Sequence, residues 1–428
     1  MPVLRINDRG ALVQILQLGL IRSGYLSGSP DGIFGPDTQS ALRLFQRNFG
    51  LPQTGELDAA TWAQLQRFIK GYFTKTVARG DTFWGLAAQY GTSVVAIRAA
   101  NPGADPNRLQ IGQRITVPFG FPVVPGNIAY SYELVALLLD GLKARYPFIG
   151  TQVIGQSVID RDLTAIRIGT GENTLFVNAS FHANEWINTP VTLTFAENYL
   201  SAYVRGGTIG GADARALFER VTLILVPLVN PDGVDLVTGA ITSGFFYGNA
   251  VAIAENYPAI PFPSGWKANI EGVDLNLQFP ANWERAREIK FAQGFTSPAP
   301  RDFVGEAPLT APEAAAIADF TDRNDFDMII AYHTQGNIIY WKYLDYLPPE
   351  SRRIGESLSR ASGYTLELTP AASAYAGYKD WFIQENNRPG YTVETGRGSN
   401  PLPIAQFSTI YAANEPLLVT ALQETAAL

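Results

Sequence analysis

The chain of 428 residues contains no cysteine and only two histidines. Without cysteine there can be no disulfide bridge, no thiolate metal ligand and no cysteine nucleophile. Any site for a soft metal must therefore be built from histidine and carboxylate. The sequence also lacks an apolar run that approaches the roughly 18 residues needed to span a bilayer, so no membrane partner is expected.

Length and charge point to several domains. A chain of this length exceeds a typical single hydrophobic core, so we expect two or more domains. The net charge of −7 is unevenly distributed, because residues 1–118 carry 12 Lys and Arg against 7 Asp and Glu, a balance of +5, and the remainder carries 20 against 32, a balance of −12. No dense basic cluster with interleaved aromatics appears, so nucleic acid is not an expected partner.

The most informative stretch is residues 175–186. A short apolar run predicts a buried strand, and it ends in a polar turn where His182 and Glu185 stand three residues apart. The second histidine, His333, also follows an apolar run, at residues 328–332. Two histidines and a carboxylate would complete the three-ligand open site of a catalytic zinc, with water in the fourth position. A lone His-x-x-Glu pair is common without a metal, so this interpretation depends on the motifs around it.

From about residue 128 onward, amphipathic helices alternate with apolar strands. We expect strands at 151–157, 163–168, 174–180, 221–228, 327–333 and 391–394, and helices at 131–144, 190–203, 311–322, 351–361 and 401–426. This pattern predicts an α/β fold with a mixed, mostly parallel sheet flanked by helices. Active sites of such sheets lie at the carboxyl ends of the strands, where both histidine segments fall.

Two small units precede that domain. Residues 1–72 show three helical patterns, and Asp31-Gly32-x-Phe34-Gly35-x-x-Thr38 resembles the signature of the three-helix peptidoglycan-binding module. A helical bundle that only covers the catalytic domain or mediates dimers is the alternative. Residues 73–119 predict a strand, two helices and a strand, and this unit resembles a LysM module, a binder of N-acetylglucosamine-containing glycans. We expect the third domain at 120–428, after a linker rich in Pro and Gly.

Five motifs follow one another in that third domain. They are His-Ala-Asn-Glu-Trp at 182–186, Asn-Pro-Asp-Gly at 230–233, Gly-Val-Asp-Leu-Asn at 272–276, His333, and Thr-Val-Glu-Thr-Gly-Arg at 392–397. In order and rough spacing they resemble the zinc carboxypeptidase family. The resemblance implies one Zn²⁺ per chain held by His182, Glu185 and His333, with Glu394 as general base. It also implies that Asp274 holds a ligand imidazole in the right tautomer.

The departures from the family pattern concern substrate recognition. Where the exopeptidases carry Asn-Arg to bind a terminal carboxylate, this chain has Asn276-Leu277. The arginine that polarises the carbonyl is replaced by Lys267, and the arginine of His-x-Arg-Glu by Asn184. Leucine offers no donor and lysine is only a point charge, so capture of an ordinary carboxyl terminus is not expected.

The sequence also leads to expectations about how a substrate is covered and bound. The family's closing tyrosine falls at Ile383, with Tyr375 or Tyr378 as candidate substitutes. Asn184, Asn276, Gln278 and Arg397 are the expected substrate-binding residues.

Residues 266–280 resemble the bacterial branch of the family that cleaves γ-D-glutamyl to meso-diaminopimelate bonds in cell-wall peptides. This implies a zinc endopeptidase acting on peptidoglycan, with the glycan bound by the two front modules and the stem peptide in the active site. The alternatives are a metallocarboxypeptidase on ordinary peptides and an inactive wall-binding protein. We therefore expect action at the cell wall. Because the N-terminus shows no secretory signal, extracellular, forespore and cytoplasmic locations stay open.

Overall fold

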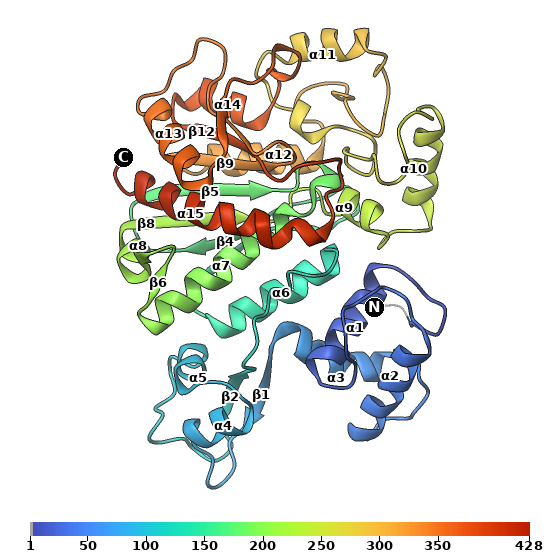
Figure 1. Cartoon of the computed structure of the whole chain (residues 1–428), viewed down its shortest axis with the longest axis vertical. Coiled ribbons are helices and arrows are strands. Elements are labelled where there is room, and N and C mark those ends of the chain that lie inside the picture. The colour runs from blue at the N-terminus through green and yellow to red at the C-terminus, as the bar shows by residue number, and fades with distance from the viewer. Residues whose placement is uncertain (1–2) are drawn as a thin grey trace. The chain divides into compact units, whose positions relative to one another are not determined.

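The computed structural model describes residues 3–428 and divides the chain into two compact units, one ending at Ile149 and the other running from Gly150 to Leu428 (Figure 1). Each unit is described by itself. Within residues 3–428, no helix combines the length and the apolar character that crossing a membrane requires.

The first unit opens with the predicted three-helix module. Its helices are α1 (Ala11–Arg22), α2 (Pro36–Asn48) and α3 (Ala59–Lys70). Phe34, Phe45 and Leu65 are fully buried between them. Asp58 caps α3 by accepting a hydrogen bond from the Thr61 backbone N–H at 2.7 Å. The buried amide of Gln17 holds the loop before α2, because it donates to Asp31 Oδ1 at 2.7 Å and accepts from the Gly32 N–H at 2.9 Å.

The predicted strand–helix–helix–strand unit follows. It consists of β1 (Tyr72–Thr76), α4 (Phe83–Gln89), α5 (Val94–Ala100) and β2 (Arg114–Pro118), with β1 and β2 paired antiparallel. The side chains of Thr82 and Ser93 cap the two helices by accepting from the backbone N–H groups of Gly85 and Ala96. Both front modules therefore have the predicted element order.

The first compact unit also contains α6 (Tyr132–Arg145), which follows the Pro- and Gly-rich linker. A Cβ added to Gly141 would lie 2.2 Å from the Lys70 carbonyl oxygen, so only glycine permits this close approach of α6 to the end of α3. Arg145 donates to the carbonyl oxygens of Gly71, Phe119 and Phe121. These bonds join linker, modules and helix, and the domain boundaries after residues 72 and 119 stay predictions.

The second unit is built on an eight-stranded mixed sheet in the order β11-β10-β12-β9-β5-β8-β4-β3. Its strands are β3 (Gly150–Gln156), β4 (Asp162–Ile168), β5 (Asn173–Ala179), β8 (Val221–Val226), β9 (Met328–His333), β10 (Ile338–Tyr340), β11 (Thr365–Glu367) and β12 (Gly390–Glu394). The four central strands β12, β9, β5 and β8 run parallel, and β4 and β3 add an antiparallel edge. The predicted α/β fold is confirmed.

Helices cover both faces of this sheet. The helices that contact its strands are α7 (Asn188–Arg205), α8 (Ala214–Arg220), α12 (Pro312–Asp322), α13 (Ser351–Ser362), α14 (Tyr378–Asn386) and α15 (Phe407–Thr425). The connections also contain α9 (Pro231–Thr238), α10 (Phe245–Glu255) and α11 (Trp283–Ala292). Phe176 of β5 and Ile329 of β9 share one core cluster with Ile317 of α12 and Trp381 of α14. Helices α7 and α15 contact each other and β5, and Figure 1 shows α15 lying across the strands. Burial on both faces explains the continuous apolar strands.

Candidate active site

Three neighbouring parallel strands end at the same edge of the sheet, and each brings a predicted site residue there. Strand β9 ends at His333 and β12 at Glu394, which are paired with each other in register. Strand β5 ends at Ala179, three residues before His182. Because the carboxyl ends of parallel strands meet at one edge, residues far apart in sequence converge there.

A single 3₁₀ turn, Ala183–Glu185, positions the other two predicted metal ligands. With three residues per turn, side chains three positions apart lie on the same side, so His182 and Glu185 face one centre. The Ala183 N–H donates to the Lys267 carbonyl oxygen at 2.9 Å and ties the turn to the segment that carries Lys267. All three ligand candidates are buried.

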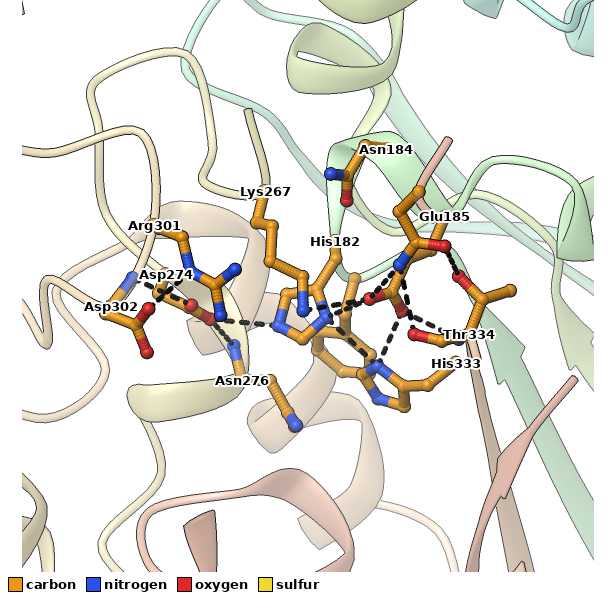
Figure 2. Close-up of polar contacts among 12 residues, drawn as sticks. His182, Asn184, Glu185, Lys267, Asp274, Asn276, Arg301, Asp302, His333 and Thr334 are labelled. Carbon is orange, nitrogen blue, oxygen red and sulfur yellow. Dashed lines mark hydrogen bonds and ion pairs between the residues drawn. The ribbon is translucent and has the colours of Figure 1, made fainter. Parts of the chain in front are cut away.

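The donor atoms of His182, Glu185 and His333 surround one point (Figure 2). The Nδ1 atoms of the two histidines lie 3.1 Å apart, and each lies 3.0 Å from a Glu185 carboxylate oxygen. Ligand atoms about 2.0–2.1 Å from a tetrahedral zinc lie roughly 3.3 Å from one another. The nitrogen and oxygen donors and their separations therefore fit zinc.

Asp274 fixes the orientation of one ligand ring. Its Oδ1 lies 3.1 Å from His182 Nε2 and its Oδ2 accepts the Asp302 backbone N–H at 3.1 Å. A carboxylate at Nε2 keeps a proton on that nitrogen and leaves Nδ1 free to bind a metal. The position of Asp274 agrees with the role that the resemblance implied.

The carboxylates set the protonation of the metal-free cluster. Burial and Lys267 work against protonation of His182, but Glu185 and Asp274 outweigh them and raise its pKa to about 9. Burial lowers the pKa of His333. Although burial opposes it, Lys267 and His182 hold the pKa of Glu185 well below its usual value. A metal ion that binds at Nδ1 must displace the proton of His182.

The two predicted catalytic residues line the same pocket, a cavity of about 220 Å³ that also contains the three metal-ligand candidates. Lys267 Nζ lies 3.0 Å from Glu185 Oε1. Burial and the nearby Glu185 raise the pKa of Glu394 to about 8. A bound cation would stabilise the ionised form of Glu394 and lower this pKa, which suits a general base.

Of the four predicted substrate-binding residues, the structure brings one to the pocket. Asn276 lines it, and its Oδ1 accepts the Tyr378 backbone N–H at 3.0 Å. Gln278 lies outside the lining and is fully buried, with its amide bound to Val304 O, Ala307 O, Thr310 and the Ala311 N–H. Those bonds hold the loop before α12.

The other two lie outside the pocket lining as well. Asn184 is buried and donates to the Ser264 carbonyl oxygen at 3.2 Å. Arg397 is exposed, because the chain turns at Gly396, whose φ is 71°. Tyr378 is unsuited to closing over a substrate, since its hydroxyl lies in the core 3.0 Å from Thr321 Oγ1.

Sequence reasoning missed several residues of the site. The Thr334 N–H donates to Glu185 Oε2 at 3.1 Å, and Thr334 Oγ1 donates to Asn400 Oδ1 at 2.7 Å. Arg301, Asp302 and Lys290 line the pocket opposite the strand ends. The position of Thr334 directly after His333 could have identified it, whereas the loop residues carry no periodic pattern.

Comparison with protein families matches all three predicted regions. Residues 135–416 match the zinc carboxypeptidase model, residues 9–65 a putative peptidoglycan binding domain and residues 76–118 a LysM domain. Gamma-D-glutamyl-L-diamino acid endopeptidase 1 of Lysinibacillus sphaericus is 47% identical over 299 residues, which cover 70% of this chain and 72% of that protein. The uncharacterized protein YqgT of Bacillus subtilis is 41% identical over 281 residues, covering 65% and 73%.

Solved structures agree with the fold. Carboxypeptidase A from Helicoverpa armigera superposes with a TM-score of 0.51 at 17% identity, covering 99% of both chains. Thrombin activatable fibrinolysis inhibitor gives a TM-score of 0.53 at 17% identity, covering 70% of this chain and 75% of that one. The family match over most of the chain, together with the donor cluster at the strand ends, shows that this protein belongs to the zinc carboxypeptidase family.

Proposed function

We propose that the protein is a zinc-dependent endopeptidase that hydrolyses the γ-D-glutamyl to meso-diaminopimelate bond of peptidoglycan stem peptides. The observation that carries this proposal is a pocket in which a complete metal-ligand set and Glu394 face a wall where Leu277 stands in place of a carboxylate-binding arginine. The activity named for the Lysinibacillus sphaericus relative supports the same bond.

His182, Glu185 and His333 would hold the zinc, which supplies polarisation of the scissile carbonyl and a lowered pKa of its water. Glu394 takes a proton from the attacking water and passes it to the leaving amine. Lys267 places its positive charge where negative charge develops on the carbonyl oxygen. Asp274 orients His182, and Asn276 is the proposed polar contact to the substrate. Gln278, Asn184 and Arg397 are left out because their side chains lie elsewhere.

The two front modules support action at the cell wall. Both match families of wall-binding domains, and we assign the glycan strands to these modules and the stem peptide to the pocket. The LysM unit exposes 75% of Trp84, a large flat side chain of the kind that packs against sugar rings. Trp84→Ala should slow digestion of intact sacculi and leave a soluble tripeptide unaffected. Phe245→Ala, at an equally exposed aromatic of the second unit, is the matched control.

The direct test is to incubate the zinc-loaded protein with purified muropeptides and to identify the cut bond by mass spectrometry. Cleavage between D-glutamate and meso-diaminopimelate, absent in Glu394→Gln, is the expected result. Release of only the terminal residue of a tetrapeptide stem, with the D-glutamate to meso-diaminopimelate bond intact, would instead identify a metallocarboxypeptidase. No cleavage by a protein that retains zinc would identify an inactive wall-binding protein.

A further inference from the structure

Three charged residues, Lys290, Arg301 and Asp302, form a cluster on the pocket wall that faces the metal-ligand side. Lys290 Nζ lies 2.5 Å from Asp302 Oδ1, and Arg301 Nε lies 2.5 Å from Asp302 Oδ2. One carboxylate thus serves two cations. Within this cluster two positive charges face one negative charge.

Arg301 is the more exposed of the two cations. Lys290 and Asp302 are mostly buried, with 11% and 12% of their side chains exposed, and each satisfies the other. The side chain of Arg301 is 44% exposed, and among residues 3–428 Asp302 Oδ2 is the single hydrogen-bond partner that the structure gives it. A guanidinium has five N–H donors in a planar fork, so the two Nη groups of Arg301 remain available to a ligand.

The backbone on both sides of Arg301 is fixed to the reaction centre. The Pro300 carbonyl oxygen accepts the N–H groups of Lys267 at 2.7 Å and Ala268 at 3.0 Å, and the Asp302 N–H donates to Asp274 Oδ2. Figure 2 shows the Arg301 side chain beside Asp274 and Lys267, next to the His182 ring. The available donors therefore lie close to where the scissile bond must bind.

Asp302 itself adopts an unusual backbone conformation. Its φ is 65°, in the left-handed region that non-glycine residues occupy at a cost of about 1–3 kcal/mol. At this turn Arg301 lines the pocket with 44% of its side chain exposed, while Asp302 stays buried.

We infer that Arg301 is a specificity-determining residue that binds a carboxylate of the substrate and takes over the recognition that Leu277 cannot provide. This inference rests on the proposed function. A γ-D-glutamyl bond leaves the α-carboxylate of the D-glutamate free beside the cleaved acyl group, and meso-diaminopimelate carries a second carboxylate on its side chain. Both are planar carboxylates, which a guanidinium group can bind with two parallel hydrogen bonds.

The test compares four stem tetrapeptides on the zinc-loaded full chain, because in a tetrapeptide the α-carboxyl group of diaminopimelate is part of a peptide bond. They carry an acid or an amide at the D-glutamate α-position, and an acid or an amide at the diaminopimelate side-chain position. The wild type should prefer the acid at one position by about tenfold to 100-fold in kcat/KM, the usual worth of a charge-assisted hydrogen bond. Arg301→Gln should reduce that preference to nearly one and leave the other position unchanged. The affected position identifies which carboxylate is bound.

Arg285→Gln is the matched control, since Arg285 is an exposed arginine of α11 that pairs with Glu288 outside the pocket. Arg301→Lys, which keeps the charge without the planar fork, should retain an intermediate preference. An equal acid preference in the wild type and Arg301→Gln would overturn the inference, and so would a wild type without preference at either position.

Binding measurements test carboxylate recognition by Arg301 independently of the proposed reaction. In a Glu394→Gln background, calorimetry measures the affinity for the four peptides with and without Arg301→Gln, whether or not the wild type cleaves them. Absence of cleavage by the wild type contradicts the proposed function alone. An acid preference in binding that disappears with Arg301→Gln still supports carboxylate recognition, and affinities that do not differ contradict it.

Discussion

The two sides of the pocket are built from different kinds of structure. On one side, His333 and Glu394 end adjacent parallel strands and are held in register by the sheet. On the other side, Lys267, Leu277 and Arg301 lie on a long connection that contains only the 3₁₀ turn Leu275–Leu277 and α11. The three metal-ligand candidates and Glu394 keep the residue types of the family pattern, whereas Lys267 and Leu277 on the loop side replace arginines of that pattern. Strand ends thus fix the chemistry, and the loop determines recognition.

Several contacts join the two sides, among them the Lys267–Glu185 ion pair and the bond from Asp274 to a zinc-ligand ring. Asp274 belongs to the loop side and contacts the ring of His182 on the metal-ligand side at 3.1 Å. Its second oxygen accepts the backbone N–H of Asp302, next to Arg301. The residue that orients a zinc ligand therefore also anchors the segment that presents the proposed carboxylate-binding arginine. Changes on the two sides should be separable except at Asp274 and at Lys267, which pairs with Glu185.

The largest effect is expected on the metal-ligand side, at Glu394. Glu394→Gln should retain zinc but lose roughly 10² to 10⁴ in kcat, because a positioned proton carrier contributes about that much. Steady-state kinetics on the stem tripeptide with zinc analysis of the same sample provides the measurement. Glu367→Gln, at an exposed glutamate of β11, is the control and should behave as wild type. Activity of Glu394→Gln within a few-fold of wild type would assign the proton transfer to another group.

On the loop side, Leu277→Arg would test recognition without touching the metal ligands. Leu277 is 8% exposed, lines the pocket and packs against Trp283 and Val304. A new arginine should raise kcat/KM on simple C-terminal peptides by roughly 10- to 150-fold, the value of a charge-assisted bond to their carboxylate. The same substitution should lower kcat/KM on the stem peptide, because Lys290 and Arg301 line the same pocket and their positive charges repel the new arginine.

Leu277→Met is the control for this change, since it conserves volume and apolar character. If the loop side determines recognition, Leu277→Arg must raise kcat/KM on the simple C-terminal peptide and lower it on the stem peptide. A fall on both substrates would show that Leu277 supports the fold of the loop and does not determine which carboxylate is accepted.

Removing the charge of Asp274, which contacts the ring of His182 from the loop side, should have an intermediate effect on zinc affinity or activity. Asp274→Asn keeps the shape but removes the charge that stabilises the His182 ring, and changes to a residue that orients a metal ligand typically cost about 10- to 100-fold in metal affinity or activity. Competition with a zinc chelator measures the affinity. Asp380→Asn, at a buried pocket aspartate that pairs with Lys379, is a matched comparison. Unchanged zinc affinity in Asp274→Asn would show that the negative charge of Asp274 is not needed to orient the ring of His182.

The sequence predicted the metal-ligand side better than the loop side, for physical reasons. Apolar runs that end in polar residues mark strand ends, so the sequence alone could place His182, Glu185, His333 and Glu394 together. Neighbours in sequence misled the prediction elsewhere, because the 3₁₀ turn directs Asn184 toward Ser264 and the turn at Gly396 leaves Arg397 exposed. Arg301 was missed because its position depends on backbone bonds to Lys267 and Asp274 that no periodicity encodes.

The smallest expected effect on catalysis lies beneath the loop side, at Glu313 of α12, where a change acts on stability. This carboxyl group is fully buried and accepts hydrogen bonds from the Asn269 side chain at 3.2 Å and the Val158 N–H at 3.3 Å. Burial raises its pKa from 4.5 to about 7, and the nearby Asp232 adds to the shift. The native state thus keeps a proton on Glu313 at pH values where the unfolded chain has lost it.

Protonated Glu313 therefore favours the folded state below pH 4.5, and this contribution disappears as the pH rises to about 7. The difference in the free energy of unfolding over that window is on the order of 3 kcal/mol. Glu313→Gln cannot titrate, so its thermal midpoint relative to wild type should rise between pH 5 and pH 8. Glu306→Gln, an exposed change just before α12, should follow the wild type at every pH. If Glu313→Gln and the wild type instead show parallel midpoints across this range, the carboxyl group is ionised in the folded protein and the loop that carries Lys267 rests on a buried charge.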